Sequence, residues 1–274
     1  MKTSIIISFF ERIDYLRCCL DALKCSAGDF EEVVIADDGS GEGTVARIEA
    51  LIPLYDFPVV HAWHPKNGFR LAAARNNGIR HATGDYLVFI DCDFLLLPGA
   101  IQCHLRAARP GRFVAGLVKY LTEEQTGRLL ASPVTGRLLE ELYGELPDRP
   151  ITREHRKFIW RSILLKPGWI SPRKQRCSSH FSIHRRDMER INGYDENFVG
   201  WGGEDEDIAM RFVKAGFQGF SVISCARALH VWHPHELRGK HWKEGPNVPY
   251  LNRDNVPFFC ENGLIKQRDI DRRE

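Results

Sequence analysis

The chain contains no run of apolar residues long enough to cross a bilayer, for which about 18 in succession are needed. Its opening apolar run, residues 5–10, is also too short to be the apolar part of a secretory signal with a cleavage site. The sequence therefore predicts a protein without a membrane span. We expect it to be cytoplasmic, either soluble or peripheral at the inner face of the membrane.

The sequence also lacks the regular cysteine spacing of a disulfide-bonded protein, and it lacks a strong net charge. The eight cysteines are scattered singly, apart from the adjacent Cys18 and Cys19, so reduced thiols are the favoured interpretation. The net charge of +2 carries no nucleic-acid signature, and we expect no nucleic-acid partner. With 274 residues and a hydrophobic fraction of 43%, the chain can still bury a large core.

The run Gly200–Asp207 is the most informative stretch that is present. It places four successive carboxylates behind a tryptophan and glycines, at the start of a predicted amphipathic helix. Burying all four would carry a large desolvation cost, so we expect most of them to face water, a cation or a polar ligand. A solvated acidic helix start would explain the acids but not Trp201-Gly202-Gly203. An aromatic ring beside carboxylates suits a sugar-binding site.

A second acidic signal ends a predicted buried strand. Residues 85–90 are apolar, aromatic and branched, and Asp91-Cys92-Asp93 follows them. On an extended chain, residues two apart point the same way, so both carboxylates can meet one divalent cation. The D-x-D pattern is common by chance, but its place at the end of a buried strand favours a metal site.

The first half of the sequence alternates between strand and helix patterns. Strands are predicted at 4–9, 33–36, 59–63 and 85–90, and helices at 13–24, 44–51 and 71–81. This alternation predicts an α/β fold with a mostly parallel sheet and helices on both faces. Such sheets bind ligands beyond the carboxyl ends of their strands. Phe10, the pair Asp37-Asp38, and Asp91 with Asp93 all fall at such ends.

Several segments match a known family in order. They are residues 4–12, Ala36-Asp37-Asp38-Gly39-Ser40, Asn76-Asn77-Gly78, Gly84-Asp85-Tyr86 and Asp91-Cys92-Asp93. Together they resemble an inverting, family 2-type glycosyltransferase with the Rossmann-like GT-A fold. Residues 200–208 resemble the C-terminal segment shared by galactosyltransferases and bacterial chondroitin-type polymerases. The resemblance covers roughly residues 3–120 and 177–235, whereas residues 121–176 and the tail after His235 match no family pattern.

The resemblance implies three parts and an activity. Residues 1–120 would be the nucleotide-sugar-binding half, 121–176 a helical, basic and aromatic insertion, and 177–274 the acceptor-binding and catalytic part of the same domain. The activity implied is metal-dependent inverting transfer of a hexosyl or N-acetylhexosaminyl group. The donor would be a nucleotide-sugar, most simply UDP-linked. The acceptor would be a hydroxyl of a glycan or glycolipid in cell-surface polysaccharide synthesis.

A divalent cation is part of this expectation, since it neutralises the diphosphate of the donor as it leaves. The resemblance implies Mn²⁺ or Mg²⁺ on Asp91 and Asp93, directly or through water. It implies His230 as a third, imidazole ligand, which would favour Mn²⁺. His233 is a rival because the H-x-x-H spacing fits both. For each histidine, a structural role is the alternative.

The nucleotide-binding residues also follow from the resemblance. Asp38 resembles the residue that holds the uridine, and an Asx-turn role is its alternative. Phe10 and Arg12 would lie against the base, although Arg12 also suits a solvated cation at a helix start. Arg75 would touch the base or a phosphate. Arg70 is either a second such contact or a surface residue.

Asp205 is the predicted catalytic base. Inverting transfer is a single in-line displacement in which the acceptor hydroxyl loses a proton, and one carboxylate suffices for that. Which of the adjacent acids takes this role rests on the resemblance. Asp207 would instead cap the helix. The residues expected to bind sugar hydroxyls or to stack on a sugar are Trp201, Gly203, Glu204 and Glu206.

The segment from Arg153 to Arg176 contains eight Lys or Arg residues and one acid, Glu154, interleaved with large apolar side chains. This composition indicates an anionic membrane surface, an anionic saccharide or a lipid-diphosphate acceptor as a partner. Nucleic acid is disfavoured because no binding motif accompanies it. The alternatives are an apolar insertion packed on the core with solvated cations, or a part that orders over bound donor.

Two other classes of protein have a comparable pattern. A noncatalytic nucleotide-sugar or glycan-binding protein would not need both the D-x-D and Asp205. A metal-dependent nucleotidyltransferase would usually carry a glycine-rich, basic phosphate loop after the first strand. Here Phe9-Phe10-Glu11-Arg12 occupies that place.

Overall fold

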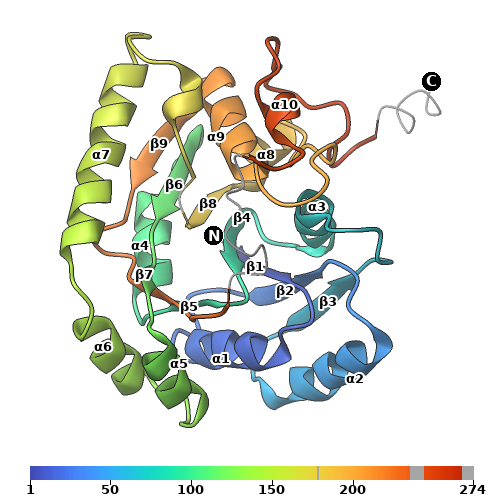
Figure 1. Ribbon diagram of the computed structural model, residues 1–274, viewed down its shortest axis with the longest axis vertical. Coiled ribbons are helices and arrows are strands. Elements are labelled where there is room, and N and C mark those ends of the chain that lie inside the picture. Colours follow the sequence, from blue (N-terminus) through green and yellow to red (C-terminus); the bar gives the residue numbers. More distant parts are fainter. Residues whose placement is uncertain (178, 235–243, 267–274) are drawn as a thin grey trace.

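The computed structural model describes residues 1–177, 179–234 and 244–266 (Figure 1). The other residues of the predicted C-terminal part, 178, 235–243 and 267–274, lie outside this description. The strands are β1 (Thr3–Phe9), β2 (Glu32–Asp37), β3 (Val59–Trp63), β4 (Tyr86–Asp91), β5 (Phe94–Leu96), β6 (Arg112–Gly116), β7 (Lys119–Tyr120), β8 (His180–His184), β9 (Gln218–Ser221) and β10 (Ala228–His230). The helices are α1 (Ile13–Lys24), α2 (Glu42–Leu51), η1 (Ile52–Leu54), α3 (Leu71–His81), α4 (Ala100–Ala107), α5 (Glu123–Leu130), α6 (Gly136–Gly144), α7 (Arg149–Leu165), η2 (Pro172–Lys174), α8 (Arg185–Arg190), α9 (Glu204–Lys214) and α10 (Val248–Leu251).

A seven-stranded sheet in the order β3-β2-β1-β4-β8-β6-β9 forms the centre of the molecule. Strands β1 to β4 run parallel to one another, β8 is antiparallel to both β4 and β6, and β9 is parallel to β6. A smaller sheet has the order β5-β10-β7. The mostly parallel α/β sheet expected from the alternation of strands and helices is confirmed.

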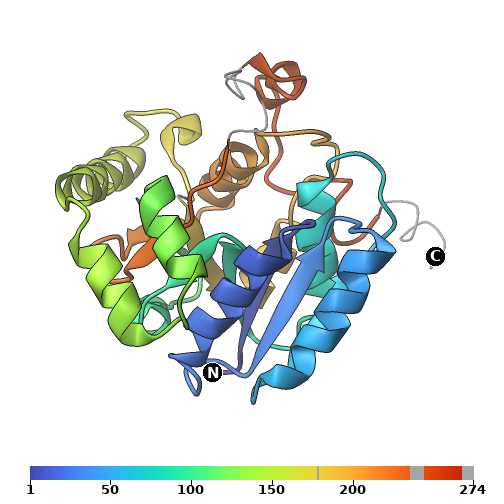
Figure 2. The same cartoon turned by 60° about the horizontal axis from the view of Figure 1, so that its bottom comes forward.

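Helices cover both faces of the large sheet, as expected (Figures 1 and 2). Successive side chains of β1 point to opposite faces, so Ile5 and Ile7 pack in the core cluster that contains α1, α2 and α4. Ile6 packs in the second cluster, with α3, α8 and α9. Burial of these apolar side chains on the two faces holds the sheet between its helical layers.

Residues 121–176 contain the helices α5, α6, α7 and η2, and they help to complete both core clusters. Leu129 of α5 and Leu139 of α6 pack in the cluster with α1. Ile151 and Phe158 of α7 pack in the cluster with α3 and α9. The segment therefore contributes to the same core as the rest of the described chain, whereas the proposed division into three functional parts remains a prediction.

The motif Asn76-Asn77-Gly78 has a structural explanation. A Cβ atom on Gly78 would lie 2.9 Å from the Cβ of Ala36 and 2.9 Å from Ile6, so only glycine lets α3 approach the sheet this closely. Asn76 is fully buried, and its amide nitrogen donates to the carbonyl of Tyr194 at 2.8 Å. Its side-chain oxygen accepts from the backbone amide of Tyr194 at 2.9 Å, which ties the loop before α9 to α3.

A buried ion pair fixes α9. Asp207 and Arg211 are both fully buried, with 2.7 Å between the carboxylate and Nε. Arg211 also donates to the carbonyls of Ile191 and Gly193, and Arg253 lies 3.2 Å from the other oxygen of Asp207. The expectation that Asp207 caps the helix is wrong, because it makes no capping bond and Gly203 holds the cap position.

Replacing Arg211 by Ala should lower the free energy of unfolding by about 3–5 kcal/mol, because Asp207 would lose its fully buried partner. Urea denaturation followed by circular dichroism measures this loss. Arg128 is the matched control, since it makes ion pairs with Glu141 and Glu145 on the surface. Its replacement by Ala should leave stability almost unchanged. Equal effects of the two variants would contradict the structural role of the buried pair.

No helix in the described ranges is long and apolar enough to span a membrane. All eight cysteines fall within these ranges, and each has a free thiol.

Candidate active site

The carboxyl ends of the parallel strands meet at one edge of the sheet. Phe9 of β1 is in register with Asp37 of β2, which is in register with Trp63 of β3. On the other side of β1, Ser8 is in register with Asp91. The predicted convergence of polar residues at this edge is therefore present in the fold.

The smaller sheet brings a distant histidine to the D-x-D turn. Strand β10 pairs antiparallel with β5, which places His230 opposite Phe94. The backbone amide of Val231 then donates to the carbonyl of Asp93 at 2.9 Å. Residues more than a hundred positions apart in the sequence thus become neighbours through backbone pairing.

Asp93, His230 and His233 form a cluster in which one ligand atom from each lies within 4.8 Å of the others. The Nε2 atoms of His230 and His233 lie 3.8 Å and 3.2 Å from Asp93 Oδ2. The other oxygen of Asp93, Oδ1, is buried and has no hydrogen-bond partner among the described residues. One carboxylate and two imidazoles can together hold a divalent transition-metal ion, and the uncompensated buried oxygen fits a cation site.

Electrostatics at this cluster favour a charged carboxylate. Burial raises the pKa of Asp93, but the hydrogen bond with His233 and the charges of His230 and Arg12 outweigh it, and the pKa falls below its usual value. The same hydrogen bond raises the pKa of His233, whereas burial lowers that of His230. Arg12, expected against the base, instead places Nη1 at 3.3 Å from Asp93 Oδ2.

Asp91 lies apart from this cluster. The sequence argument assumed an extended D-x-D, but Cys92 and Asp93 form a turn between β4 and β5, so the two carboxylates have different partners. Asp91 Oδ1 accepts from Arg75 Nη2 at 3.1 Å. Both histidines, rather than one of them, accompany Asp93. The assignment of Asp91 as a metal ligand remains a prediction.

Arg75 connects the sheet edge to the acidic helix. This side chain is 6% exposed and donates from Nε to Ser8 Oγ at 3.0 Å. Its Nη1 lies 2.8 Å from Asp205 and 3.7 Å from Glu204. Arg75 was expected to touch the base or a phosphate. In this structure it lies between the carboxylates of Asp91 and Asp205, and its contact with a nucleotide remains a prediction.

The four successive acids do not share one environment. The side chain of Asp205 is 44% exposed and that of Glu206 is 19% exposed, and Glu206 pairs with Arg176. Glu204 and Asp207 are buried. The expectation was that most of these acids face water, a cation or a polar ligand. Asp205 and Glu206 are partly exposed, whereas Glu204 and Asp207 are buried beside the cations of Arg75 and Arg211.

Glu204 has an unusual protonation equilibrium. Burial, and then the charge of Asp205, raises its pKa to about 8, compared with about 4.3 in an unfolded chain. Between these values the folded protein keeps a proton that the unfolded chain has released. Stability should therefore fall as the pH rises from about 5 to about 8.

Replacing Glu204 by Gln should remove this part of the pH dependence. We expect the thermal midpoint of the wild type to fall more between pH 5 and pH 8 than that of the variant, which carries no proton to lose. Thermal unfolding at the two pH values measures the difference. Glu49→Gln, at an exposed position of α2, is the control and should behave as the wild type. A Glu204→Gln variant with the wild-type pH dependence would contradict the assignment.

A second group of residues, around Asp38, forms a candidate site for the base of the nucleotide. Its carboxylate accepts from the backbone amide of Arg70 at 3.0 Å and from Lys66 Nζ at 3.2 Å. Lys66 Nζ also lies 3.4 Å from the ring centroid of Phe10. The carboxylate that bonds to the turn after β2 is that of Asp37, whose Oδ1 accepts from the backbone amide of Ser40, three residues on, at 2.9 Å.

The side chain of Arg70 makes a contact within the fold, which disfavours the alternative that Arg70 is only a surface residue. Its Nη2 donates to the carbonyl of Glu196 at 3.2 Å, so the side chain bridges the start of α3 to the loop before α9. The role of its guanidinium in nucleotide contact remains a prediction.

The Trp201 loop leads into the acidic helix. Trp201 is 41% exposed and lies between glycines that adopt positive φ angles, +88° at Gly200 and +87° at Gly202. Gly203 has φ +99°, and a Cβ there would lie 2.8 Å from the ring of Phe198. Glycine is therefore required at this position, and the role of Trp201 in stacking on a sugar remains a prediction.

Sequence reasoning missed Lys66 and Arg176. Lys66 lies in the loop between β3 and α3, at the same strand edge as Asp38, so its place after a predicted strand was an available signal. Arg176 was counted only as part of the basic segment, and nothing in the sequence indicates its pairing with Glu206.

Comparison with family models identifies the chain. Residues 4–165, more than half of it, match the model described as Glycosyl transferase family 2. The chain belongs to this family. Residues 162–234 match the model described as the N-terminal domain of galactosyltransferase. The resemblance is confirmed, but its extent was underestimated, because the two models together also cover residues 121–176.

Curated relatives agree with this assignment. The chain is 27% identical to the Uncharacterized glycosyltransferase YfnE of Bacillus subtilis (strain 168), over 98% of the chain and 73% of that protein. It is 25% identical to the Chondroitin synthase of Escherichia coli, over 93% of the chain and 38% of that protein. The chain thus spans well under half of the chondroitin synthase.

Solved structures share the fold at low sequence identity. A mannosyltransferase from Pyrobaculum calidifontis in complex with GDP-Man and Mn²⁺ has a TM-score of 0.61 and 15% identity, covering 93% of this chain and 66% of that one. GalNAc-T7 with UDP, GalNAc and Mn²⁺ has a TM-score of 0.59 and 15% identity, covering 85% and 44%. The family 2 glycosyltransferase therefore has the expected GT-A fold.

Proposed function

We propose that this family 2 enzyme transfers a hexosyl or N-acetylhexosaminyl group, with inversion, from a UDP-linked donor to a hydroxyl of a glycan or glycolipid. The observation that carries the proposal is the arrangement around Arg75. This buried cation contacts Asp91, beside the metal cluster, and Asp205, on the open side of α9. Donor-binding and proton-accepting groups are thereby held at the same strand edge.

The donor end is proposed around the metal cluster and Asp38. Asp93, His230 and His233 would hold Mn²⁺, which neutralises the charge of the diphosphate when bound. Asp38 and the ring of Phe10 would hold the base, with Lys66 close to both. The UDP and Mn²⁺ bound to GalNAc-T7 support this choice of donor and ion.

The acceptor end is proposed on the first turn of α9. Asp205 takes the proton of the attacking hydroxyl, because its carboxylate is half-exposed and is held at 2.8 Å by Arg75. Glu206 accepts a hydrogen bond from a sugar hydroxyl, and Trp201 stacks on a sugar face. Glu204, whose pKa is raised to about 8 by burial, would donate to a sugar oxygen.

The acceptor and its setting are proposed more broadly. The chondroitin synthase relative supports a glycan acceptor and a role in cell-surface polysaccharide synthesis. We further propose that the enzyme acts in the cytoplasm, with peripheral contact to an anionic membrane. The basic and aromatic residues between Arg153 and Arg176 support that contact.

A panel of UDP-sugars and GDP-mannose, each incubated with Mn²⁺, tests the proposal. One UDP-sugar should be hydrolysed slowly without acceptor and faster with a glycan acceptor, and the anomeric configuration of the product should be inverted. Binding of a donor without turnover would favour a noncatalytic protein. Release of pyrophosphate from a nucleoside triphosphate and a sugar phosphate would favour a nucleotidyltransferase.

A further inference from the structure

We propose that the outer face of α7, together with Trp169, docks on the surface of an anionic lipid bilayer. We call this the α7 face. Its members are the basic residues Arg149, Arg153, Arg156, Lys157 and Arg161 and the apolar residues Ile159, Trp160, Ile163 and Trp169. The proposal is an interaction surface of its own. Only its consequence for the acceptor rests on the proposed function.

Helix α7 is attached to the fold along one narrow side. Ile151 and Phe158 are its buried residues, and His155 Nδ1 lies 2.7 Å from Ser221 Oγ of β9. The spacing of four and three residues between these positions is that of one helix face. Of the other fifteen residues of this 17-residue helix, nine are exposed and six are half-buried.

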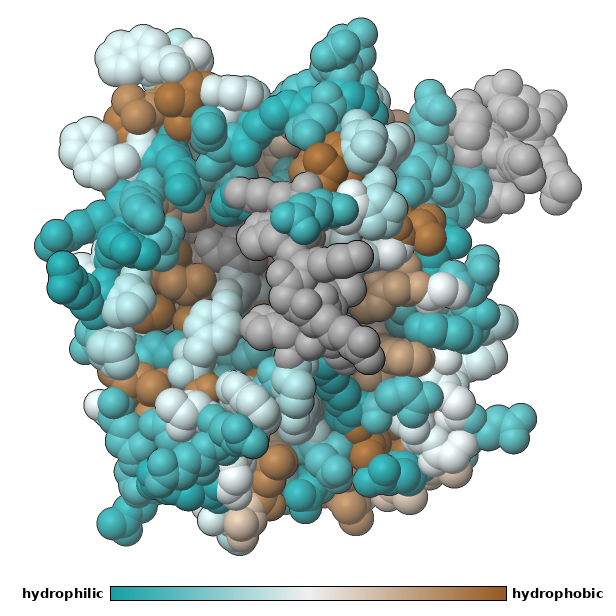
Figure 3. Space-filling view, in the orientation of Figure 1, coloured by the Kyte–Doolittle hydropathy of each residue, from teal (hydrophilic) through white to brown (hydrophobic). Residues whose placement is uncertain are grey.

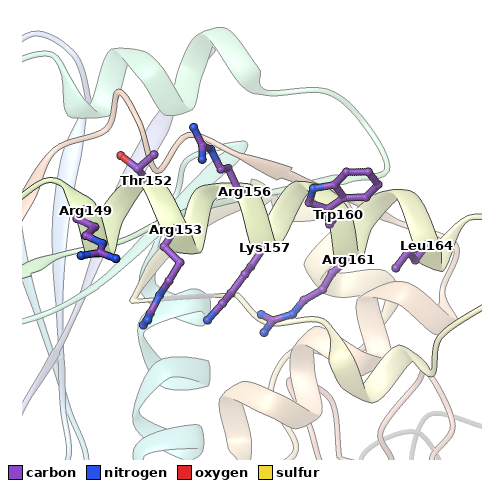
Figure 4. A pocket seen from close by; sticks show the side chains of 8 residues that line it. All are labelled: Arg149, Thr152, Arg153, Arg156, Lys157, Trp160, Arg161 and Leu164. Atoms are coloured by element: carbon purple, nitrogen blue, oxygen red, sulfur yellow. The ribbon is translucent and has the colours of Figure 1, made fainter.

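Four cations follow one side of the helix at intervals of four residues. Figure 4 shows Arg149, Arg153, Lys157 and Arg161 side by side, pointing the same way. Like charges at this spacing repel each other and destabilise a helix. Glu154 is the one acid that pairs with them within the described chain. A dense row of cations with so little neutralisation is complementary to an anionic surface.

Large apolar side chains are exposed beside these cations. Trp160 is 64% exposed, Trp169 is 75% exposed and Ile163 is 49% exposed. In Figure 3, pale and brown side chains gather at the upper left, over the C-terminal end of α7, and teal side chains follow the same edge below them. An apolar end next to a basic flank is typical of helices that lie in a membrane interface.

The end of α7 fixes Trp169 on this face. Gly168 has φ +75°, and its amide donates to the carbonyl of Leu165 at 3.0 Å. The amide of Trp169 donates to the carbonyl of Leu164 at 3.1 Å. This pair of bonds is a Schellman motif, so Trp169 is held at the helix terminus and adds a second ring to the apolar end.

The chemistry favours lipid over an anionic saccharide. Tryptophan rings are enriched at the headgroup level of membranes, where an apolar ring meets water, and arginine and lysine attract anionic headgroups. A saccharide site would also need acceptors for hydroxyls, and Glu154 is the one carboxylate on this helix.

The α7 face lies close in sequence and space to the acceptor end. From α7 the chain continues through η2, which packs against α9, to Arg176, which pairs with Glu206. If Asp205 and Glu206 serve an acceptor as proposed, docking would hold that end of the site beside the bilayer. An acceptor carried on a membrane lipid is the consequence.

Co-sedimentation with vesicles tests the docking. The wild type should bind vesicles of three parts phosphatidylcholine to one part phosphatidylserine at low salt, and binding should fall at least 10-fold in pure phosphatidylcholine or in 0.5 M salt, where charges are screened. The variant Arg149→Glu, Arg153→Glu and Lys157→Glu should lose at least 10-fold in partitioning. These residues are exposed, so the variant should remain folded, and circular dichroism checks this.

A matched variant controls for net charge. Arg17, Lys24 and Arg47 are exposed residues of α1 and α2, and their replacement by Glu changes the charge by the same amount. This control should keep wild-type binding. Trp160→Ala with Trp169→Ala should weaken binding at equal charge. Residues 173 and 174 are left unchanged, because Arg173 donates to the carbonyls of Leu251 and Arg253.

Several results would overturn the proposal. These are absence of wild-type binding at low salt, an equal loss in the control variant, or unchanged binding of the double tryptophan variant with displacement by a soluble anionic polysaccharide. The last result would assign the α7 face to a saccharide. Donor hydrolysis is measured on the same proteins. Lost hydrolysis with intact vesicle binding would contradict the transferase function and leave the docking surface standing.

Discussion

Replacing Asp205 by Asn should lower the transferase turnover by about 10²–10⁴-fold and leave donor affinity nearly unchanged. Asparagine has the size of aspartate and keeps a hydrogen-bond acceptor for Arg75, but it cannot take the proton of the attacking hydroxyl. Because Arg75 also contacts Asp91 and Glu204, the guanidinium should stay in place. Steady-state kinetics with separate values of kcat and KM for each substrate measure the effect.

Glu206→Gln is the matched control for Asp205→Asn. Both changes remove one carboxylate from the first turn of α9, but Glu206 is proposed to bind a sugar hydroxyl, so its replacement should raise the KM for the acceptor more than it lowers kcat. If Asp205→Asn retained turnover and lost donor binding, Asp205 would serve recognition. Glu204 and Glu206 would then become the candidates for the base.

Replacing Asp93 by Ala should abolish the Mn²⁺-dependent part of UDP binding. The diphosphate carries a charge that a cation must offset, and Asp93 is the one carboxylate in the cluster with His230 and His233. Isothermal titration calorimetry of UDP with and without Mn²⁺ measures the effect. His233→Ala should weaken the Mn²⁺ dependence in the same direction.

Asp91→Asn separates the two carboxylates of the D-x-D. If Asp91 ligates the cation, this variant should lose the Mn²⁺ dependence as Asp93→Ala does. If its contact with Arg75 is its main role, Mn²⁺-dependent UDP binding should persist while turnover falls. UDP binding with the wild-type Mn²⁺ dependence in Asp93→Ala itself would show that the metal assignment is wrong.

Most regular elements up to β4 could be predicted from periodicity alone. The helices 13–24 and 71–81 and the strand 59–63 have the predicted bounds, the other strands differ by one residue at one or both ends, and α2 begins two residues earlier than predicted. The apolar pattern is strong here because β1, β2 and β4 are buried on both faces and the helices cover those faces. Convergence at the carboxyl edge followed from that parallel order.

The environment of each site residue could not be predicted in the same way. Sequence reasoning gave the four acids of α9 different roles but could not tell which are buried. Arg75 lies next to Asp205 and Glu204, and Arg211 next to Asp207. Whether a carboxylate is buried depends on the cation that the fold brings to it. Arg75 lies far away in the sequence from Glu204 and Asp205, the two acids that it contacts.

The sequence by itself determined the fold class, the strand edge that carries the site and the residues that compete for each role. The tertiary structure decided which of these residues lie next to one another. Pairing of β10 with β5 brings His230 to Asp93, and the turn at Cys92 separates Asp91 from Asp93. The physical reason is the separation in the sequence over which each kind of interaction acts. Periodicity and turn chemistry act between residues a few positions apart, whereas strand pairing and buried ion pairs join residues whose separation leaves no local signal.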